Sequence, residues 1–262
     1  MKKGRLTKQE QSLRFKLLLE YVFIFRYTTR AQLDLFAQTA IKLRFPQRLI
    51  EYALSKGYLG RYYEPSLNAK IYFLTQKAKD FLYPDPLIEH YSFEKGSIEE
   101  GNFLRHNLLV DTFFLLNRYI EASLKKWQSG WLLRRLNKQR SGTIPDALFI
   151  TADSKKIAVE VITEHTGLAS LKHMVSFYQA EIENNHKYHA VLIVASCTYR
   201  YEHLKKFLFA INPNFCPKAF ILTEPEMLGE TGSCFHQDKL RIIEVAFKLA
   251  GGIKNANPQQ SP

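Results

Sequence analysis

Apolar residues recur at helical spacing in the first part of the chain and predict three helices. The first helix runs from Gln9 to Phe25, where large apolar side chains form one face. The Thr28–Thr29 pair then stands as an N-cap before a short second helix. Pro46 is placed in the first turn of a third helix, which is expected to end at Gly57.

Two strand-like runs follow the third helix. Residues 58–63 and 69–74 are rich in aromatic and β-branched side chains, and they flank a polar turn at 64–68. A helix over 76–82 follows, and the prolines of Tyr83-Pro-Asp-Pro86 disfavour its continuation. Three helices with a two-stranded wing predict a winged helix-turn-helix domain over 1–84, which a linker at 85–97 separates from a second domain at 98–250.

The pattern of residues 143–164 predicts a β-hairpin that carries two acids. Short apolar runs at 148–150 and 157–162 flank the polar turn 151–156, and Asp146 and Glu160 lie in the two arms. A buried carboxylate without a partner costs several kcal/mol, so such acids are usually paired, hydrogen-bonded or bound to a metal. A hard cation such as Mg²⁺, held by one or two carboxylates, would supply the missing charge.

The hydrophobic pattern places further helices and strands on both sides of this hairpin. A helix with a broad apolar face is expected over 98–124, and Trp131–Leu133 is expected to form the first strand of the core. The elements expected after the hairpin are a helix at 168–184, a strand at 190–195, a helix at 199–211, a strand at 219–223 and a strand or helix at 240–249. Residues 251–262 are expected to be a disordered tail.

Pro145-Asp146 on one strand and Glu160 on the next resemble the PD-(D/E)xK nuclease-like superfamily, whose signature is Pro-Asp followed by Glu-x-Lys. Ile162 stands where the lysine belongs. Within the superfamily the segment looks most like the replication-relaxation proteins of plasmids and integrative elements and the related MobC-type relaxases. Their hairpin is likewise followed by a Thr-Gly turn and a helix with Lys and Tyr, which here are Thr166-Gly167, Lys172 and Tyr178.

The resemblance implies a fold of class α+β or α/β, in which a winged helix precedes a restriction-endonuclease-like mixed-sheet core. Mrr-like restriction endonucleases join the same two parts. The chemistry it implies is metal-assisted phosphodiester cleavage, with Asp146 and Glu160 as catalytic residues that hold Mg²⁺ or Mn²⁺. Lys172 either replaces the missing lysine or is an exposed helix residue.

Other candidates for this site come from neighbouring segments. His106, in the helix at 98–124, either packs in the core or reaches the acids, as Glu100 also would. A His in this helix is a familiar feature of the replication-relaxation family. Glu164 and His165 would lie at the rim of the site. If the relaxase resemblance holds, Tyr21 or Tyr27 is a candidate nucleophile in place of water.

The chain carries a formal net charge of +12, which indicates a polyanionic partner. Residues 1–90 hold 16 Lys and Arg against 8 Asp and Glu, and their net charge of +8 is two thirds of that of the whole chain. The cations predicted to contact DNA phosphates lie near the third helix, on the wing and in a basic segment before Pro145. The alternative is that these side chains form an ordinary charged surface in contact with water. They are Lys42, Arg44, Arg48, Arg61, Lys70, Arg134, Arg135, Lys138 and Arg140.

The sequence also narrows the class of protein. It shows no run of about 20 apolar residues and no signal-peptide core, so a cytoplasmic protein without a membrane partner is expected. Three cysteines without a C-x-x-C spacing indicate neither a zinc site nor a disulfide framework.

Two functions follow from these features. The first is a metal-dependent DNA-nicking protein, relaxase-like or endonuclease, in plasmid replication or conjugative transfer. The second is a catalytically inactive, nuclease-fold accessory or regulatory protein that binds DNA. Other mobilisation or replication proteins are possible partners, and a homodimer would imply a two-fold target.

Overall fold

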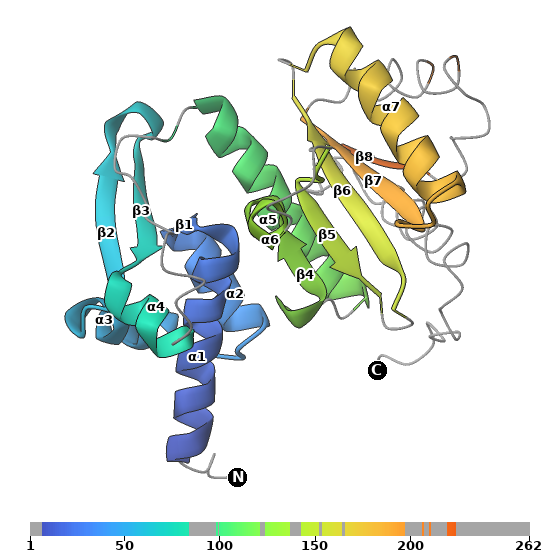
Figure 1. Cartoon of the computed structure of the whole chain (residues 1–262). Helices are drawn as coiled ribbons and strands as arrows, with labels where there is room; N and C mark the ends of the chain where they lie inside the picture. The colour runs from blue at the N-terminus through green and yellow to red at the C-terminus, as the bar shows by residue number, and fades with distance from the viewer. Residues whose placement is uncertain are drawn as a thin grey trace, which may run out of the picture. The chain divides into compact units, whose positions relative to one another are not determined.

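A computed structural model describes residues 7–83, 98, 100–120, 124–136, 143–151, 154–163, 166–196, 206, 210 and 219–223. The chain divides into two compact units, Met1–Phe103 and Leu104–Pro262. Each unit combines helices with one β-sheet, so the fold is α+β (Figure 1). Among the helices of the described part, none is both long enough and apolar enough to cross a membrane.

The first unit begins with two helices that carry their own N-terminal caps. α1 spans Lys8–Phe25, and Thr7 and Glu10 form a reciprocal capping box at its start. α2 spans Arg30–Thr39, and Thr29 and Gln32 form a second box of the same kind. The predicted N-cap function of the threonine pair is therefore confirmed for Thr29.

The rest of the first unit follows the predicted order of elements. α3 spans Pro46–Ser55 with proline in its first turn, and Gly57 follows it at φ +71°, which glycine adopts without a steric cost. β2 (Leu59–Glu64) and β3 (Ala69–Leu74) pair antiparallel, and α4 spans Gln76–Leu82. The turn between the strands is a 3₁₀ segment, η1 (Pro65–Leu67), closed by Asn68 in the left-handed conformation.

A third strand in this sheet was not predicted. β1 (Tyr27–Thr29) pairs with β3, and the strand order is β1-β3-β2. A three-residue strand is too short to show a period of two, so its pairing partner more than 40 residues downstream decides its conformation. The core beneath the sheet is aromatic, with Tyr21 of α1 stacked on Phe36 of α2 at a centroid distance of 4.2 Å.

The second unit is built on a five-stranded mixed sheet in the order β4-β5-β6-β7-β8. The β4–β5 and β5–β6 pairs are antiparallel, and the β6–β7 and β7–β8 pairs are parallel. The strands are β4 (Trp127–Ser129), β5 (Ala147–Ile150), β6 (Lys156–Ile162), β7 (Ala190–Ala195) and β8 (Ala219–Thr223). Its helices are α5 (Glu100–Ile120), which starts in the first unit, η3 (Leu124–Lys126), α6 (Gly130–Leu136) and α7 (Leu168–Glu183).

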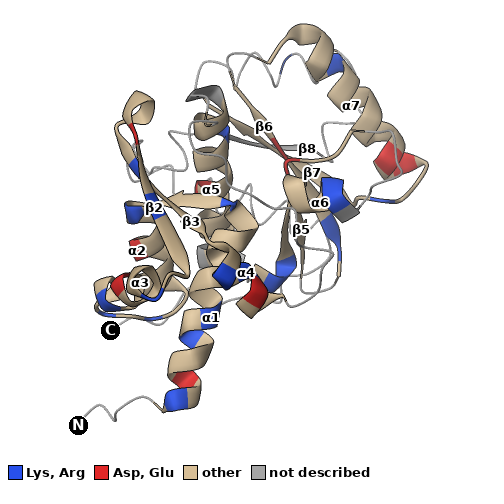
Figure 2. Cartoon of the chain, turned by 60° about the vertical axis from the view of Figure 1, so that its left-hand side comes forward, with Lys and Arg blue, Asp and Glu red and all other residues tan. Residues whose placement is uncertain are grey.

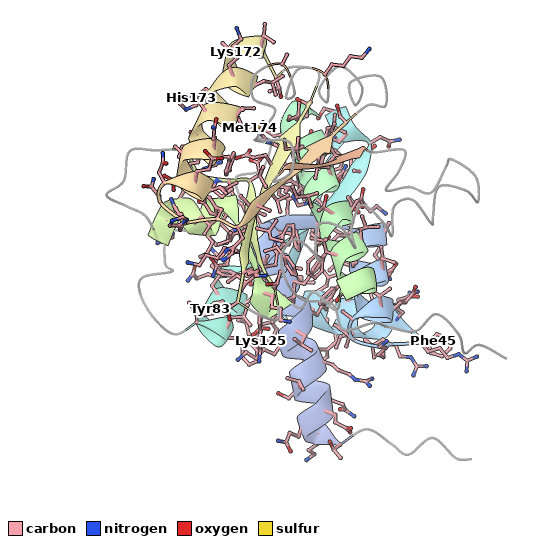
Figure 3. All side chains as sticks on the ribbon, turned by 90° about the vertical axis from the view of Figure 1, so that its right-hand side faces the viewer. Phe45, Tyr83, Lys125, Lys172, His173 and Met174 are labelled. Carbon is pink, nitrogen blue, oxygen red and sulfur yellow. The ribbon has the colours of Figure 1, made fainter. Side chains whose placement is uncertain are left out.

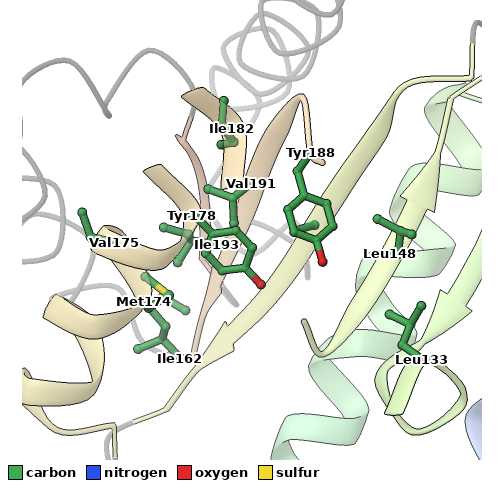
Figure 4. Packing of buried hydrophobic residues seen from close by; sticks show 12 residues of the cluster. Leu133, Leu148, Ile162, Met174, Val175, Tyr178, Ile182, Tyr188, Val191 and Ile193 are labelled. Atoms are coloured by element: carbon green, nitrogen blue, oxygen red, sulfur yellow. The ribbon is translucent and has the colours of Figure 1, made fainter. Parts of the chain in front are cut away.

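Alternate residues of the strands face different helices. Leu148 of β5, Ala158 and Ile162 of β6 and Ile193 of β7 pack with Tyr178 of α7 in one buried cluster (Figure 4). On the other side, the ring of Phe113 in α5 meets that of Trp127 in β4 at 5.7 Å. The sheet therefore lies between α5 and α7, as Figure 1 shows.

The predicted first core strand at Trp131–Leu133 is wrong. These residues belong to α6, and the strand is the preceding segment Trp127–Ser129. Gly130 separates the two because its N–H donates to the carbonyl of Asp146 at 2.7 Å, beside the start of β5. A short apolar run fits a strand or a helix equally well, and the pattern alone cannot distinguish them.

Several predicted features differ in their bounds or lie outside the described residues. The helix expected over 98–124 is described to Ile120, and Leu124 begins a 3₁₀ turn instead of ending that helix. Of the helix expected at 199–211, Lys206 and Ala210 are described, and both are helical. The linker at 85–97, the element at 240–249 and the tail at 251–262 are outside the described part.

Candidate functional site

Asp146 occupies the point where the backbone pairing of the hairpin ends. The ladder between β5 and β6 stops at the pair Ala147–Val159, and Pro145 has no N–H to extend it. Instead, Oδ2 of Asp146 accepts a hydrogen bond from the backbone N–H of Val161 at 2.9 Å. The Asp146 carboxylate thus replaces a strand carbonyl, and it is buried in this position.

Arg105 of α5 supplies the positive charge beside Asp146. Its Nε lies 3.0 Å and its Nη2 lies 2.9 Å from Oδ2 of Asp146. The same Nη2 donates to the carbonyl of Val161 at 3.1 Å. The guanidinium therefore fastens α5 to both arms of the hairpin, while its side chain remains 44% exposed.

Glu160 lies on the face of β6 that meets α7, and Tyr178 donates a hydrogen bond to its Oε1 at 2.5 Å. Burial, and after it the neighbouring charge of Asp146, raise the pKa of Glu160 to about 8. The Tyr178 hydrogen bond and the Arg105 charge oppose this rise. At neutral pH Glu160 is therefore mainly protonated, which allows its carboxyl group to share a hydrogen bond with Asp146.

The four side chains form one polar network that passes from α5 through the edge of the hairpin to α7. Arg105 binds Asp146, Asp146 neighbours Glu160, and Glu160 accepts from Tyr178. Burial also raises the pKa of the Tyr178 hydroxyl, so it stays a hydrogen-bond donor. In this arrangement both predicted acids have their partners, as buried acids require.

Both acids already have protein partners at oxygens that a divalent cation would use. Oδ2 of Asp146 already accepts from Arg105 and Val161, and Oε1 of Glu160 accepts from Tyr178, so a divalent cation at these acids would have to replace those partners. Within the described residues, no three His, Cys, Asp or Glu side chains are grouped to hold a metal ion. The guanidinium of Arg105 supplies positive charge beside Asp146, and Mg²⁺ or Mn²⁺ at the two acids stays a prediction.

The other candidates for the site lie in different environments. Lys172 is exposed on α7 (Figure 3), and His106 is buried in α5, one residue after the arginine that reaches Asp146. Tyr21 is fully buried, and burial raises the pKa of Tyr27, which disfavours a nucleophilic phenolate. Glu164, His165 and the side chain of Glu100 lie outside the described part.

Arg105 is the member of the site that sequence reasoning missed. An arginine in a helix is most often solvated, and this one lies 41 residues before its partner. The only signal in the sequence is the need of two buried acids for a cation. Tyr178, by contrast, was among the residues that carried the family resemblance.

The predicted DNA-contacting cations of the first unit are all exposed. Lys42, Arg44 and Arg48 lie before and within the first turn of α3, whereas Arg61 and Lys70 lie on β2 and β3. None of the five pairs with an acid in the part of the chain that the structure describes. Figure 2 shows basic residues spaced along α1 and single ones on α2, α3 and β2.

The second predicted group of cations is only partly described. Arg134 is exposed and Arg135 half-buried in the last turn of α6, where positive charge complements the helix dipole. Lys138 and Arg140 lie outside the described residues. The structure therefore offers a local stabilising function for Arg134 and Arg135 beside the predicted DNA contact.

No protein-family model matches this sequence, and a search of curated proteins also finds no match.

Proposed function

We propose that this protein binds DNA through its first unit, as a winged-helix protein of a plasmid or other mobile element. In this proposal α3 enters the major groove and the β2–β3 arms lie against phosphates. The second unit serves as a nuclease-like scaffold of the PD-(D/E)xK type whose acids are neutralised within the fold. The observation that carries DNA binding is the set of five exposed cations just before α3, in its first turn and on the two strands, none of which pairs with an acid among the described residues.

Ile162 supports the scaffold function of the second unit. It stands where the resemblance requires a lysine, it is 3% exposed, and it packs with Met174 and Tyr178 of α7. A lysine ammonium in this cluster would lose its hydration. Packing of α7 on the sheet thus uses the position that catalysis would need.

Metal-dependent nicking is the second candidate, and the pKa of Glu160 favours it. Strongly shifted acids with a charged neighbour occur often at functional sites. In this alternative Mg²⁺ or Mn²⁺ binds Asp146 and Glu160 after Arg105 has left the acids. The two functions differ in what they require of Arg105, which binds Asp146 in the scaffold and must release it for nicking.

DNA binding is tested by fluorescence anisotropy of a labelled duplex titrated over a range of salt concentrations. Arg44→Ala/Arg48→Ala is expected to weaken binding and to reduce the slope of log K against log[salt] by about 1 for each phosphate that the variant no longer neutralises. Lys16→Ala is the matched control, because Lys16 is an exposed cation of the same unit that already pairs with Glu20 at 3.8 Å. An equal slope in the wild type and the double variant would reject the proposed interface.

A further inference from the structure

Phe45, the residue before α3, exposes most of its aromatic ring. Its side chain is 63% exposed and stands away from the helices (Figure 3). Phe45 occupies the N-cap of α3, where Ser, Thr, Asp or Asn would stabilise the helix, and it makes no side-chain capping bond. Neither burial nor capping therefore accounts for a phenylalanine at this position.

The ring lies on the wall of an open groove between α2 and the start of α3. The groove has a volume of about 590 Å³, and apart from Phe45 and Pro46 its walls are polar or charged. The guanidinium of Arg44 lies 5.2 Å from the ring centroid, in a cation–π contact that orients the ring. The groove is open to solvent, so a planar group can reach the ring from outside.

The charges around the ring favour an anionic occupant. Arg30 pairs with both acids of the groove, with its Nε 2.9 Å from Asp34 and its Nη1 3.8 Å from Glu51. Arg44 and Arg48, also on the groove wall, pair with no acid among the described residues. Positive charge beside an exposed aromatic ring is the combination by which proteins hold unpaired nucleotides, with the cations on phosphates and the ring on a base.

We infer that Phe45 stacks on an unpaired or displaced nucleobase, so that the protein prefers DNA with a locally opened duplex. This inference rests on the proposed DNA binding and adds a substrate class to it. A phenylalanine has no donor or acceptor for base edges, whereas every unstacked base offers a face to stack on. Arg44 and Arg48 would hold the phosphates on either side of that base.

The test compares three labelled DNAs of the same sequence and at the same salt concentration: a perfect duplex, a duplex with a central mismatched bubble, and a single strand. The wild type is expected to bind the bubble more tightly than the duplex. Phe45→Ala should lower affinity for the bubble by about tenfold and leave affinity for the duplex nearly unchanged. Phe45→Trp should restore the preference, because indole also stacks on bases.

Two controls separate stacking from other effects. Leu35→Ala removes another exposed apolar side chain, 41% exposed on α2, and should leave all affinities unchanged. Arg48→Ala should weaken binding to all three DNAs by a similar factor. The same ratio of bubble to duplex affinity in Phe45→Ala and wild type would overturn the inference while DNA binding stands. A wild type that binds none of the three DNAs would overturn both.

Discussion

Glu160 is a single carboxyl group whose charge depends on pH near neutrality. Its pKa in the folded protein is raised to about 8, first by burial and then by the charge of Asp146. In the unfolded chain the group titrates at its ordinary value of 4.5. The folded state therefore binds one more proton than the unfolded state between these two values.

The sign of this difference predicts that the second unit loses stability as pH rises. The stabilisation by the bound proton is fully present below about pH 4.5, falls by up to about 1.4 kcal/mol per pH unit, and is lost above about pH 8. Glu160→Gln keeps an acceptor for Tyr178 and has no proton to lose. Its free energy of unfolding, minus that of the wild type, should rise between pH 5 and 8 and then become constant.

Urea unfolding followed by tryptophan fluorescence measures how the free energy of unfolding of the second unit changes with pH. Both tryptophans, Trp127 and Trp131, lie in the second unit. Lys187 and Glu181 form an ion pair at 3.4 Å in which the lysine side chain is 40% exposed, so Glu181→Gln is a control that should change stability little at any pH. Parallel pH profiles for wild type and Glu160→Gln would show that Glu160 is ionised in the folded protein.

The conformation of the junction between β4 and α6 depends on one small residue, Gly130. A Cβ atom on Gly130 would lie 2.5 Å from the carbonyl oxygen of Pro145 and 2.8 Å from that of Asp146. Both are backbone atoms beside the start of β5, and Gly130 itself bonds to the second of them. Only glycine lets the chain turn from strand to helix against this backbone.

Gly130→Ala is therefore expected to destabilise the second unit by about 1–3 kcal/mol, in the upper part of that range, because the clash involves backbone. Gly167→Ala is the matched control, since a Cβ atom there meets nothing within 4 Å and the expected loss is about 1 kcal/mol or less. The urea midpoint from tryptophan fluorescence compares the two variants. Equal losses would mean that the chain at Gly130 can move away from Pro145 without cost.

On the scale of the whole molecule, the two units carry different features. Residues 1–90 hold a net +8 and the five exposed cations proposed to bind DNA, whereas the network of buried acids lies in the second unit. If the second unit is a scaffold, variants of its acids should affect stability and leave DNA affinity unchanged. If it is a nuclease, the same variants should abolish strand cleavage.

Asp146→Asn distinguishes these outcomes in a supercoiled-plasmid assay with Mg²⁺, Mn²⁺ or EDTA, beside anisotropy on the same DNA. The scaffold function predicts equal DNA affinity for variant and wild type and no relaxation under any metal condition. Metal-dependent relaxation by the wild type that the variant lacks would instead establish nicking. Arg105→Gln is the companion variant, because nicking requires Arg105 to leave Asp146 and should then be faster without it.

The sequence by itself determined the elements that carry their own local signals. The Thr29 cap, the proline in the first turn of α3, Gly57 after α3 and the polar turn between β2 and β3 each act within a few residues. The two acids of the hairpin were also predicted, because a carboxylate among β-branched residues stands out in any apolar run. The resemblance to the replication-relaxation proteins and the assignment to DNA stay predictions.

Tertiary structure decided the features that depend on distant partners. β1 exists because β3 offers it hydrogen bonds, and the run around Trp131 is helical because Gly130 turns the chain against Pro145 and Asp146. The cation for Asp146 comes from Arg105, 41 residues earlier in the chain. A buried charge must be compensated, but which side chain compensates it depends on which elements pack together, and only the folded chain brings α5 to the hairpin.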